Sequence, residues 1–554
     1  MITKPILRKA PILRLLIPLY LIITAYLHVN AFEVDGLYYK ILDDSSVEVI
    51  SGSSKYTGDI IIPETVKYNG TSYPVISIGK YAFDGCKGLS YITIPNSVIS
   101  LEEFAFRDCV GLTSVIIPNS VTSIGNFAFS ACSGLTSLEL GESVEIIGDR
   151  AFSRCKGLNS VTIPNSVTTI KYCAFEECPA LKEINILSLE SWCNINFQGT
   201  NSNPLTFVHN LYLNGELIKN LILPESVSEI KTNAFEGCSC LESVTLPNSV
   251  TYIGDSAFNG CNGLTSFFIP NSVTYIGDGA FFGCSGISAI TIPNSVTYIG
   301  SSVFKNCSEI KKVKFEDGNE KVELAPSTFC AFKSCPLEDV YLGRDLYYGY
   351  PYAPFSEQTN LTKLTIGKSV KYIWGYEFSG CTNLTSVIIP NSVTYIGQNA
   401  FEGCFDLSSI TLGESIESIR ENAFKNCTSL SHITSLAINP PSVYNSCFEN
   451  DTYQTATLEV LPEALDAYKE HPVWGKFLIK DLSAINDIEN PEDDFSFSVV
   501  GGSILVNAPE GKKIDIYNIG GNLVRSTTDQ TIDGITPGIY ILRHASKSHK
   551  LLIK

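Results

Sequence analysis

Apolar residues recur along most of the chain in a pattern that repeats every 23 residues. One copy contains Leu112, Val115 and Ile117, which follow the L-x-x-L-x-L spacing of a leucine-rich-repeat strand. After a Pro-Asn-Ser turn, Val121 and Ile124 form a second short apolar segment. The pattern therefore predicts two extended segments per repeat, each with one apolar side that faces a core.

A cysteine recurs at the same interval, and a phenylalanine precedes each cysteine position by three residues. One repeat cannot bury its apolar residues alone, whereas stacked repeats share a continuous core. We therefore predict a mostly β, leucine-rich-repeat-like solenoid with ladders of identical side chains. The repeating cysteines are Cys86, Cys109, Cys132, Cys155, Cys178, Cys238, Cys261, Cys284, Cys307, Cys335, Cys381, Cys404 and Cys427, and Gln358 takes the cysteine position of one repeat.

Two stretches interrupt the repeat, and both ends of the array differ from it. Cys178 and Cys238 are 60 residues apart, and Cys307 and Cys335 are 28 apart, so we expect loops or distorted coils there. Alternating apolar residues at 32–75 predict β-hairpins that cap the first coil. At the other end we expect a short helix at 463–471, followed by Trp474 and Phe477 as apolar plugs.

The two termini have their own composition. Four basic residues, a short apolar run and Val29-Asn30-Ala31 predict a secretory signal peptide cut after Ala31, with a retained signal anchor as the alternative. No later segment is apolar enough to span a bilayer. The predicted domains are a signal peptide at 1–31, a β cap at 32–75, the solenoid at 76–437, a C-terminal cap at 438–482, an acidic linker at 483–494 and a small β-sandwich at 495–554.

Composition and motifs argue against several classes of function. Hydrophobic residues make up 44% and charged residues 17% of the 554, which favours a folded chain over a disordered one. The formal net charge of −18 disfavours binding to nucleic acid. We find no catalytic, phosphate-binding or metal-ligating motif, so we predict no enzymatic activity, no cofactor and no metal.

The eighteen cysteines allow two interpretations. An exported protein often carries disulfides. In stacked coils, however, equivalent Cβ atoms lie farther apart than the ~3.8 Å that a disulfide prefers, which favours a ladder of buried thiols. Some of the cysteines outside the ladder can still be paired, and the sequence does not say which. These are Cys173, Cys193, Cys240, Cys330 and Cys447.

Two polar columns are candidates for a binding face. One is a column of serines in the first strand, which suggests a broad and weakly selective surface. The other is a column of tyrosines in the second segment, and tyrosine is a favoured interface residue. The alternative is that these rings only stack on one another and stabilise the solenoid. The serines are Ser114, Ser137, Ser160, Ser243, Ser266, Ser386 and Ser409, and the tyrosines are Tyr252, Tyr275, Tyr298, Tyr372 and Tyr395.

The repeat consensus, IPNSVTYIGDSAFNGCNGLTSV, resembles that of BspA-like leucine-rich-repeat proteins over about residues 32–482. The resemblance implies a secreted or surface protein that adheres to host or bacterial surfaces. The tail, with its runs at 514–524, 537–542 and 550–554, resembles the C-terminal sorting domain of the type IX secretion system of Bacteroidetes. That resemblance implies export through secretion machinery and a sorting signal that includes Gly538, Tyr540 and Lys554.

Three functions are therefore open. The first is a surface adhesin that binds host or bacterial proteins through an extended repeat face. The second is a structural spacer or coat component. The third is an accessory protein that binds glycans.

Overall fold

The computed structural model describes residues 31–43, 45–199, 201–325, 331–349 and 353–482, together with the strands of a small domain between 496 and 553. The chain divides into two compact units. The N-terminal unit is Met1–Ser249 with Ser256–Gly263, and the C-terminal unit is Val250–Asp255 with Leu264–Lys554. The predicted signal peptide, apart from Ala31, and the predicted linker at 483–494 lie outside the described residues, as does Lys554.

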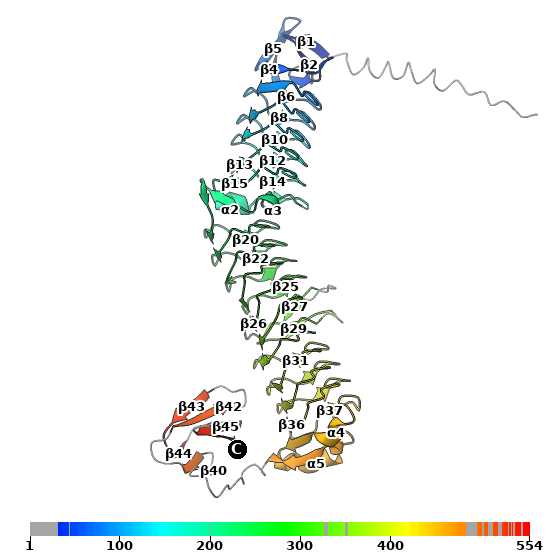
Figure 1. Ribbon diagram of the computed structural model, residues 1–554, viewed down its shortest axis with the longest axis vertical. Helices are drawn as coiled ribbons and strands as arrows, with labels where there is room; N and C mark the ends of the chain where they lie inside the picture. The colour runs from blue at the N-terminus through cyan, green and yellow to red at the C-terminus, as the bar shows by residue number, and fades with distance from the viewer. Residues whose placement is uncertain are drawn as a thin grey trace, which may run out of the picture. The chain divides into compact units, whose positions relative to one another are not determined.

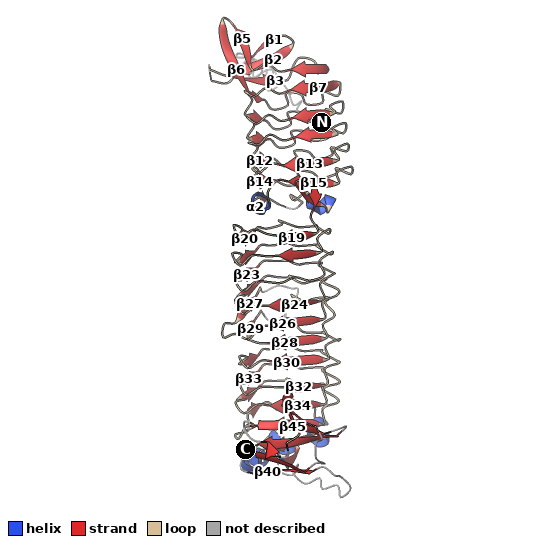
Figure 2. Cartoon of the chain, turned by 90° about the vertical axis from the view of Figure 1, so that its left-hand side faces the viewer, coloured by secondary structure: helices blue, strands red, loops and turns tan. Residues whose placement is uncertain are grey.

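Each unit contains a stack of coils, and each regular coil supplies two short parallel strands (Figures 1 and 2). Ser123 and Ile124 pair with Ser100 and Leu101 of the coil before and with Ile146 and Ile147 of the coil after. The repeat in sequence thus becomes a register in which each residue lies beside the equivalent residue of the next coil, and the predicted solenoid is confirmed.

The N-terminal unit begins with hairpins and continues into the two columns of strands. The first strands of its coils are β4 (Gly58–Ile61), β7 (Leu89–Thr93), β9 (Ser114–Ile116), β11 (Ser137–Glu139), β13 (Ser160–Ile163), β15 (Glu183–Ile186), β17 (Leu211–Leu213), β19 (Asn220–Ile222) and β21 (Ser243–Thr245). The second strands are β8 (Ser100–Leu101), β10 (Ser123–Ile124), β12 (Ile146–Ile147), β14 (Thr169–Ile170), β16 (Asn196–Phe197) and β20 (Glu229–Ile230). The hairpin strands are β1 (Ala31–Val34), β2 (Leu37–Ile41), β3 (Val47–Ile50), β5 (Thr65–Tyr68) and β6 (Thr71–Ile78), and β18 (Glu216–Leu217) pairs with β17.

The long interruption between Cys178 and Cys238 is folded. It contains two short helices, α2 (Leu189–Cys193) and α3 (Leu205–Val208), and β15 pairs with β17 across the inserted residues. The Ser188 hydroxyl accepts a hydrogen bond from the Ser191 backbone and caps α2. The insertion is therefore an enlarged coil and not a loose loop.

The C-terminal unit carries the same two columns. Its first strands are β24 (Ala289–Ile292), β26 (Lys312–Phe315), β28 (Asp339–Leu342), β30 (Lys363–Ile366), β32 (Ser386–Ile388), β34 (Ser409–Leu412), β36 (His432–Ser435), β38 (Thr457–Val460) and β39 (Leu478–Asp481). Its second strands are β22 (Tyr252–Ile253), β23 (Tyr275–Ile276), β25 (Tyr298–Ile299), β27 (Val322–Leu324), β29 (Leu346–Tyr347), β31 (Tyr372–Ile373), β33 (Tyr395–Ile396), β35 (Ser418–Ile419) and β37 (Ser442–Val443).

After the last repeat, the chain forms α4 (Thr452–Thr455), a 3-10 turn η1 (Pro462–Ala464), α5 (Leu465–Glu470) and a second 3-10 turn η2 (Trp474–Lys476). The short helix expected at 463–471 is thus present. Trp474 is fully buried and donates its indole N–H to the Pro441 carbonyl over 2.9 Å, while Phe477 is 6% exposed. Both expected apolar plugs are confirmed.

The small domain has two antiparallel sheets, as predicted. The first contains β40 (Ser496–Val500), β41 (Ser503–Asn507) and β44 (Thr531–Ile532), and the second contains β42 (Ile514–Asn518), β43 (Leu523–Thr527), β45 (Gly538–His544) and β46 (Lys547–Ile553). Residues of both sheets form one apolar cluster that includes Ile504, Ile532, Ile516 and Leu542.

Two side-chain ladders form the core of the solenoid. Phenylalanine rings of successive coils stack face to face, with centroids 4.9 Å apart for Phe106 and Phe129 and 5.4 Å apart for Phe401 and Phe424. Beside them, the cysteine thiol of a regular coil donates to the carbonyl of the phenylalanine 26 residues earlier; Cys132 and Phe106, for example, are joined over 3.1 Å. Cys335, which follows the longer interval, donates to the Phe304 carbonyl over 3.0 Å. Gln358 makes the same bond, through its amide, to the Phe332 carbonyl over 3.3 Å.

Every cysteine that the structure describes is a thiol, and all but Cys240 are buried. Burial raises the pKa of the Cys404 thiol to about 12. The buried ladder thiols therefore act as small apolar groups with a weak donor. Cys330 lies outside the described residues.

Candidate binding surface

The tyrosine column divides into two parts, both in the C-terminal unit. Tyr252, Tyr275 and Tyr298 are half-buried and stack on one another with both centroid distances at 4.6 Å and interplanar angles of 10° and 6°. Their ring faces are therefore covered, and their edges remain for a partner. Burial is the first cause, and neighbouring tyrosines and aspartates the next, of the raised pKa of Tyr275 and Tyr298. These two hydroxyls therefore stay protonated to a higher pH than an ordinary tyrosine does.

The second part is a cluster around Trp374. Tyr372 is 39% exposed, and its ring centroid lies 5.4 Å from that of Trp374. Tyr395 meets Tyr372 edge-on at 6.5 Å, and Tyr347 meets Trp374 edge-on at 6.3 Å. The structure thus brings Tyr372 and Tyr395 together with two aromatic residues that the sequence analysis did not name.

A buried carboxyl group lies beneath this cluster. Glu377 is fully buried, and its Oε2 accepts a hydrogen bond from the Trp374 backbone over 2.8 Å. Its Oε1 has no hydrogen-bond partner among the described residues. Desolvation, aided by the charge of Asp345, raises the pKa of Glu377 to about 8, against the lowering effect of the Trp374 hydrogen bond.

A third aromatic surface, in the N-terminal unit, was missed by the sequence analysis. The rings of Tyr81, Phe104 and Phe127 stack at 4.9 Å steps. The Arg107 guanidinium lies 4.6 Å from the Phe104 centroid, and that of Arg150 lies 5.9 Å from the Phe127 centroid. We call this set, together with Tyr172, the aromatic–arginine strip; Arg150 lies 4.7 Å from the Tyr172 ring.

The strip occupies an unusual backbone position. The residue before the Ala-Phe pair has a left-handed backbone, with φ of 61° at Tyr81, 57° at Phe104 and 56° at Phe127. In several other coils the same position holds residues that tolerate this region, such as Asn233, Asn399 and Asn422, or a small residue, whereas Arg150 and Tyr376 adopt it with φ of 49° and 64°. The conformation is imposed by the stack, because the N–H of Phe104 donates to the Asn126 carbonyl of the next coil over 3.0 Å.

Carboxylates hold the arginines of the strip in place. Arg107 binds Asp84 through Nε and Nη2 at 2.7 and 3.2 Å, and Arg150 binds Glu176 at 3.3 Å. Tyr81 is 40% and Tyr172 39% exposed, while Phe104 and Phe127 are half-buried. The strip therefore presents ring edges and oriented guanidinium groups to solvent.

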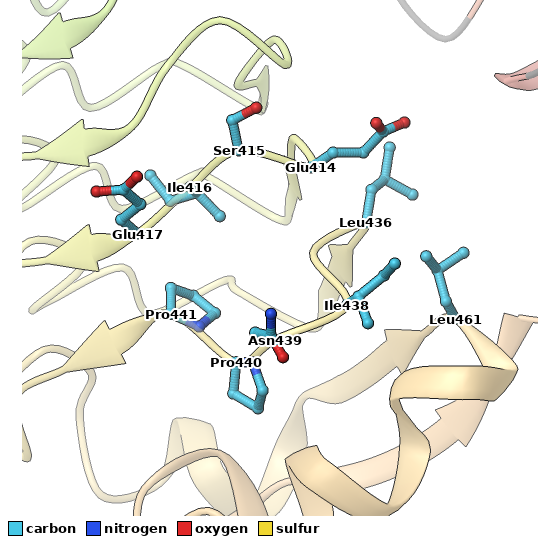
Figure 3. Close-up of a pocket in the computed structure, with 10 residues that line it drawn as sticks. All are labelled: Glu414, Ser415, Ile416, Glu417, Leu436, Ile438, Asn439, Pro440, Pro441 and Leu461. Carbon is cyan, nitrogen blue, oxygen red and sulfur yellow. The ribbon is translucent and has the colours of Figure 1, made fainter.

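Two grooves open on the C-terminal unit. One, of about 900 Å³, lies where β30 ends one sheet and β32 begins the next; it is lined by Tyr341, Leu364, Thr365 and Ile388, among others. The other, of about 760 Å³, lies between the last repeat and the C-terminal cap. In Figure 3, Leu436, Ile438 and Leu461 gather at one end of it, and Glu414 and Glu417 carry its carboxylates.

The members of the serine column are exposed or half-exposed, and all but Ser266 begin a first strand; the segment that contains Ser266 is not a strand. Of the residues proposed for sorting, Gly538 begins β45 and Tyr540 is 7% exposed in the core of the small domain. Among the described residues, no cluster of three or more metal-ligating side chains occurs. Within the same part of the chain, none of the helices has the length and apolar character needed to cross a bilayer.

The family follows from comparison with known proteins. The model of the BspA type leucine rich repeat region (6 copies) matches residues 75–203, 206–338 and 350–466. The chain belongs to the BspA-type leucine-rich-repeat family. The predicted repeat family is therefore confirmed, whereas the type IX sorting domain stays a prediction.

One solved structure in particular gives the same fold. A leucine-rich repeat protein from Bacteroides ovatus is 30% identical, with a TM-score of 0.52 over 78% of this chain and 99% of that one. A leucine rich cell surface protein from Faecalibacterium prausnitzii is 24% identical, with a TM-score of 0.34 over 73% of this chain and 94% of that one. None of the curated proteins that were compared matches the chain.

Proposed function

We propose that this protein is displayed on the cell surface and binds protein partners there, as an adhesin of host or bacterial surfaces. The observation that carries the proposal is the aromatic–arginine strip. Export by the predicted signal peptide, and attachment through the C-terminal domain with Gly538, Tyr540 and Lys554, belong to the same proposal.

The strip has a stability cost that the solenoid does not require. A left-handed backbone costs an L-residue roughly 1–2 kcal/mol, and asparagine bears it more easily than a bulky ring. Stacking recovers about 0.5–1.5 kcal/mol per aromatic pair, so Tyr81, Phe104 and Phe127 bring little net stability. Large aromatic residues that are exposed or half-buried and bring little structural benefit are best explained by an interface.

The chemistry of the strip favours a protein partner. Tyrosine and arginine are over-represented among the residues that dominate binding energy. Arg107 and Arg150 already lie on aromatic rings and are held by carboxylates, so they lose little freedom when a partner binds. The Tyr252–Tyr275–Tyr298 stack and the Tyr372–Trp374–Tyr395 cluster are proposed as secondary contact surfaces.

The spacer role is a second candidate, and the tyrosine stack favours it. Rings that cover one another's faces at 4.6 Å stabilise the coils without any ligand. Ordered self-assembly without binding to a foreign surface supports this role. Glycan binding is supported only if sugar affinity falls when Tyr372 or Tyr395 is replaced by alanine.

The test replaces the three rings of the strip by the residue that other coils use. The triple variant Tyr81→Asn, Phe104→Asn and Phe127→Asn should keep its melting temperature within a few degrees of wild type, because asparagine suits the left-handed backbone. Its binding to immobilised host matrix proteins or to partner bacteria should fall at least about tenfold, which equals about 1.4 kcal/mol.

The matched control carries Tyr252→Ser, Tyr275→Ser and Tyr298→Ser. Serine is chosen because another coil has serine, Ser123, at the equivalent position. This control should lose stability and keep most of the binding. Equal binding by wild type and the strip variant, to every surface that wild type binds, contradicts the assignment of the strip.

A further inference from the structure

The enlarged coil leaves one ladder cysteine without the partner that its equivalents have. In regular coils, the thiol donates to the carbonyl of a phenylalanine 26 residues earlier, as Cys261 does to Phe235 over 3.2 Å. For Cys238 that earlier position is Tyr212 on β17, because the insertion has replaced the regular coil. The Cys238 sulfur lies instead 3.6 Å from the sulfur of Cys240.

Cys240 differs from every other described cysteine. It is only partly buried, whereas the others are buried. Its sulfur donates to the Ile218 carbonyl at 3.4 Å, and its backbone N–H meets the His209 carbonyl at 3.4 Å. A sulfur that solvent reaches thus lies in contact with a buried one, within the tripeptide Cys-Ser-Cys.

We propose that Cys238 and Cys240 are a redox-active dithiol that closes to a disulfide by exchange with external disulfides, with Cys240 as the attacking sulfur and Cys238 as the resolving one. This site goes beyond the proposed adhesion and does not depend on it.

The local electrostatics agree with these roles. The hydrogen bond from Cys238 is the main cause that holds the pKa of the Cys240 thiol well below its ordinary value, with the main chain of Leu211 and nearby His209 as further causes. The same pairing and burial raise the pKa of Cys238. The thiolate is the nucleophile of exchange, so the exposed sulfur is the more reactive one.

The exchange balances in two steps. The Cys240 thiolate attacks one sulfur of an external disulfide, which forms a mixed disulfide and releases one thiolate. The Cys238 thiol then loses its proton and attacks the Cys240 sulfur, which releases the second thiolate. The two protein thiols lose two electrons and two protons, and the external disulfide becomes two thiols.

The geometry requires a small movement. The two sulfurs must approach from 3.6 Å to about 2.05 Å, the length of a disulfide bond. Rotation of the partly exposed Cys240 side chain can supply most of this movement, because the Cys238 backbone is held by its N–H bond to the Phe235 carbonyl at 3.1 Å. The oxidant belongs to the class of small or protein disulfides that an oxidising compartment supplies.

The chain offers a clean readout. Cleavage after Glu236 and Glu242 releases the hexapeptide GCSCLE, 237–242, which contains only these two cysteines. The full-length protein is equilibrated with oxidised glutathione, alkylated and digested, and the masses of the peptides are measured. We expect the hexapeptide to escape alkylation and to carry an internal disulfide, about 2 Da lighter than the unalkylated dithiol. Excess reduced glutathione should reverse the disulfide, and the peptide should then carry two alkyl groups.

Three controls separate the proposal from unfolding and from nonspecific oxidation. Cys238→Ser should stop at a glutathione adduct on Cys240, and Cys240→Ser should leave Cys238 unmodified. In the native protein, Cys240 should alkylate at least about tenfold faster than Cys261, a buried ladder thiol of the same unit. The rate at which Cys240 is alkylated should rise with pH, and the midpoint of that rise should lie below the ordinary thiol pKa of about 8.5.

A hexapeptide that remains a dithiol in oxidised glutathione overturns the proposal. Oxidation of Cys261 at the same rate also does so, because it indicates access through unfolding. If Cys238→Ser does not fold, as circular dichroism will report, the comparison of wild type with Cys240→Ser decides the matter alone. Loss of the exchange leaves the adhesion proposal untouched, since the strip variants are tested by binding.

Discussion

At the residue scale, this solenoid is informative where a side chain departs from the consensus of its position. Phe104 and Phe127 accept a left-handed backbone for a half-buried ring, and Cys240 adds a second sulfur where the ladder has one. Glu377 is a third departure, because it stands between Tyr376 and Phe378 where most coils have alanine. A carboxyl group there must lose its water, and its protonation therefore becomes coupled to folding.

Glu377 should make the C-terminal unit less stable as the pH rises. Its folded pKa of about 8 lies above the ordinary value of about 4.3, so the stabilisation is complete below pH 4.3 and is lost as the pH rises through 8. Glu377→Gln keeps the acceptor for the Trp374 N–H and has no charge to lose. Urea unfolding between pH 5 and 9 should show a free energy of unfolding that falls by an amount on the order of a few kcal/mol in wild type and stays flat in the variant. Parallel pH profiles for the two proteins contradict this assignment.

At the element scale, the unit of structure is the coil, and its interior consists of ladders. The phenylalanine rings stack on the rings of the coil before and the coil after, and the thiol of a regular coil donates to the coil before. Glycines allow this close stacking: a Cβ on Gly125 would lie 2.6 Å from the Glu102 carbonyl carbon of the preceding coil. Local changes therefore act on the interfaces between coils.

Gln358 occupies the cysteine position of one coil, so substitutions there test the thiol ladder. Gln358→Cys should restore the regular donor to the Phe332 carbonyl and stay within about 1 kcal/mol of wild type. Gln358→Ala removes the donor and leaves a void, and it should cost about 1–3 kcal/mol in denaturant unfolding. If the alanine variant is as stable as the cysteine variant, the hydrogen bond contributes nothing.

Phe129 tests the ring ladder. It stacks between Phe106 and Phe152 with centroid distances of 4.9 and 5.4 Å and is fully buried. Phe129→Ala should destabilise the N-terminal unit by about 3–5 kcal/mol, because the cavity cannot close between two fixed coils. Phe129→Leu fills part of that space and should cost less; an alanine variant with unchanged unfolding is the outcome that argues against the ladder as core.

At the scale of the whole molecule, the chain combines a long acidic repeat array with a small β domain that follows it. The net charge of −18 favours solubility and repels phosphate backbones, which agrees with the proposed binding of protein partners. The domain boundaries at 31, 75, 437, 482 and 494, and the sorting role of the tail, remain predictions.

The tail can be tested by display on intact cells. The full-length protein and a variant ending at Asp481 are expressed in the producing bacterium, treated with external protease, and the released peptides are identified by mass. Peptides from 86–427 should be released only when the tail is present. Release from both proteins removes the sorting role from the tail, and release from neither removes the main support for an adhesin.

The sequence alone determined the solenoid, because each coil is specified by its own residues and binds only its neighbours. A fixed spacing of Leu112, Val115, Ile117, Phe129 and Cys132 is enough to set strand, turn and ladder. The stacking of Tyr81, Phe104 and Phe127 could also have been predicted, because the three residues occupy the same position of successive repeats. The sequence did not show that this position has a left-handed backbone.

Only the tertiary structure decided what the departures from the repeat do. No spacing rule places the Cys238 sulfur against Cys240, since that contact depends on how the irregular residues 179–237 fold. The same holds for the burial of Glu377 and for the covered faces of Tyr252, Tyr275 and Tyr298. Repetition fixes local geometry through nearest neighbours, whereas reactivity, pKa and exposure depend on the exact packing of irregular segments, which the period does not encode.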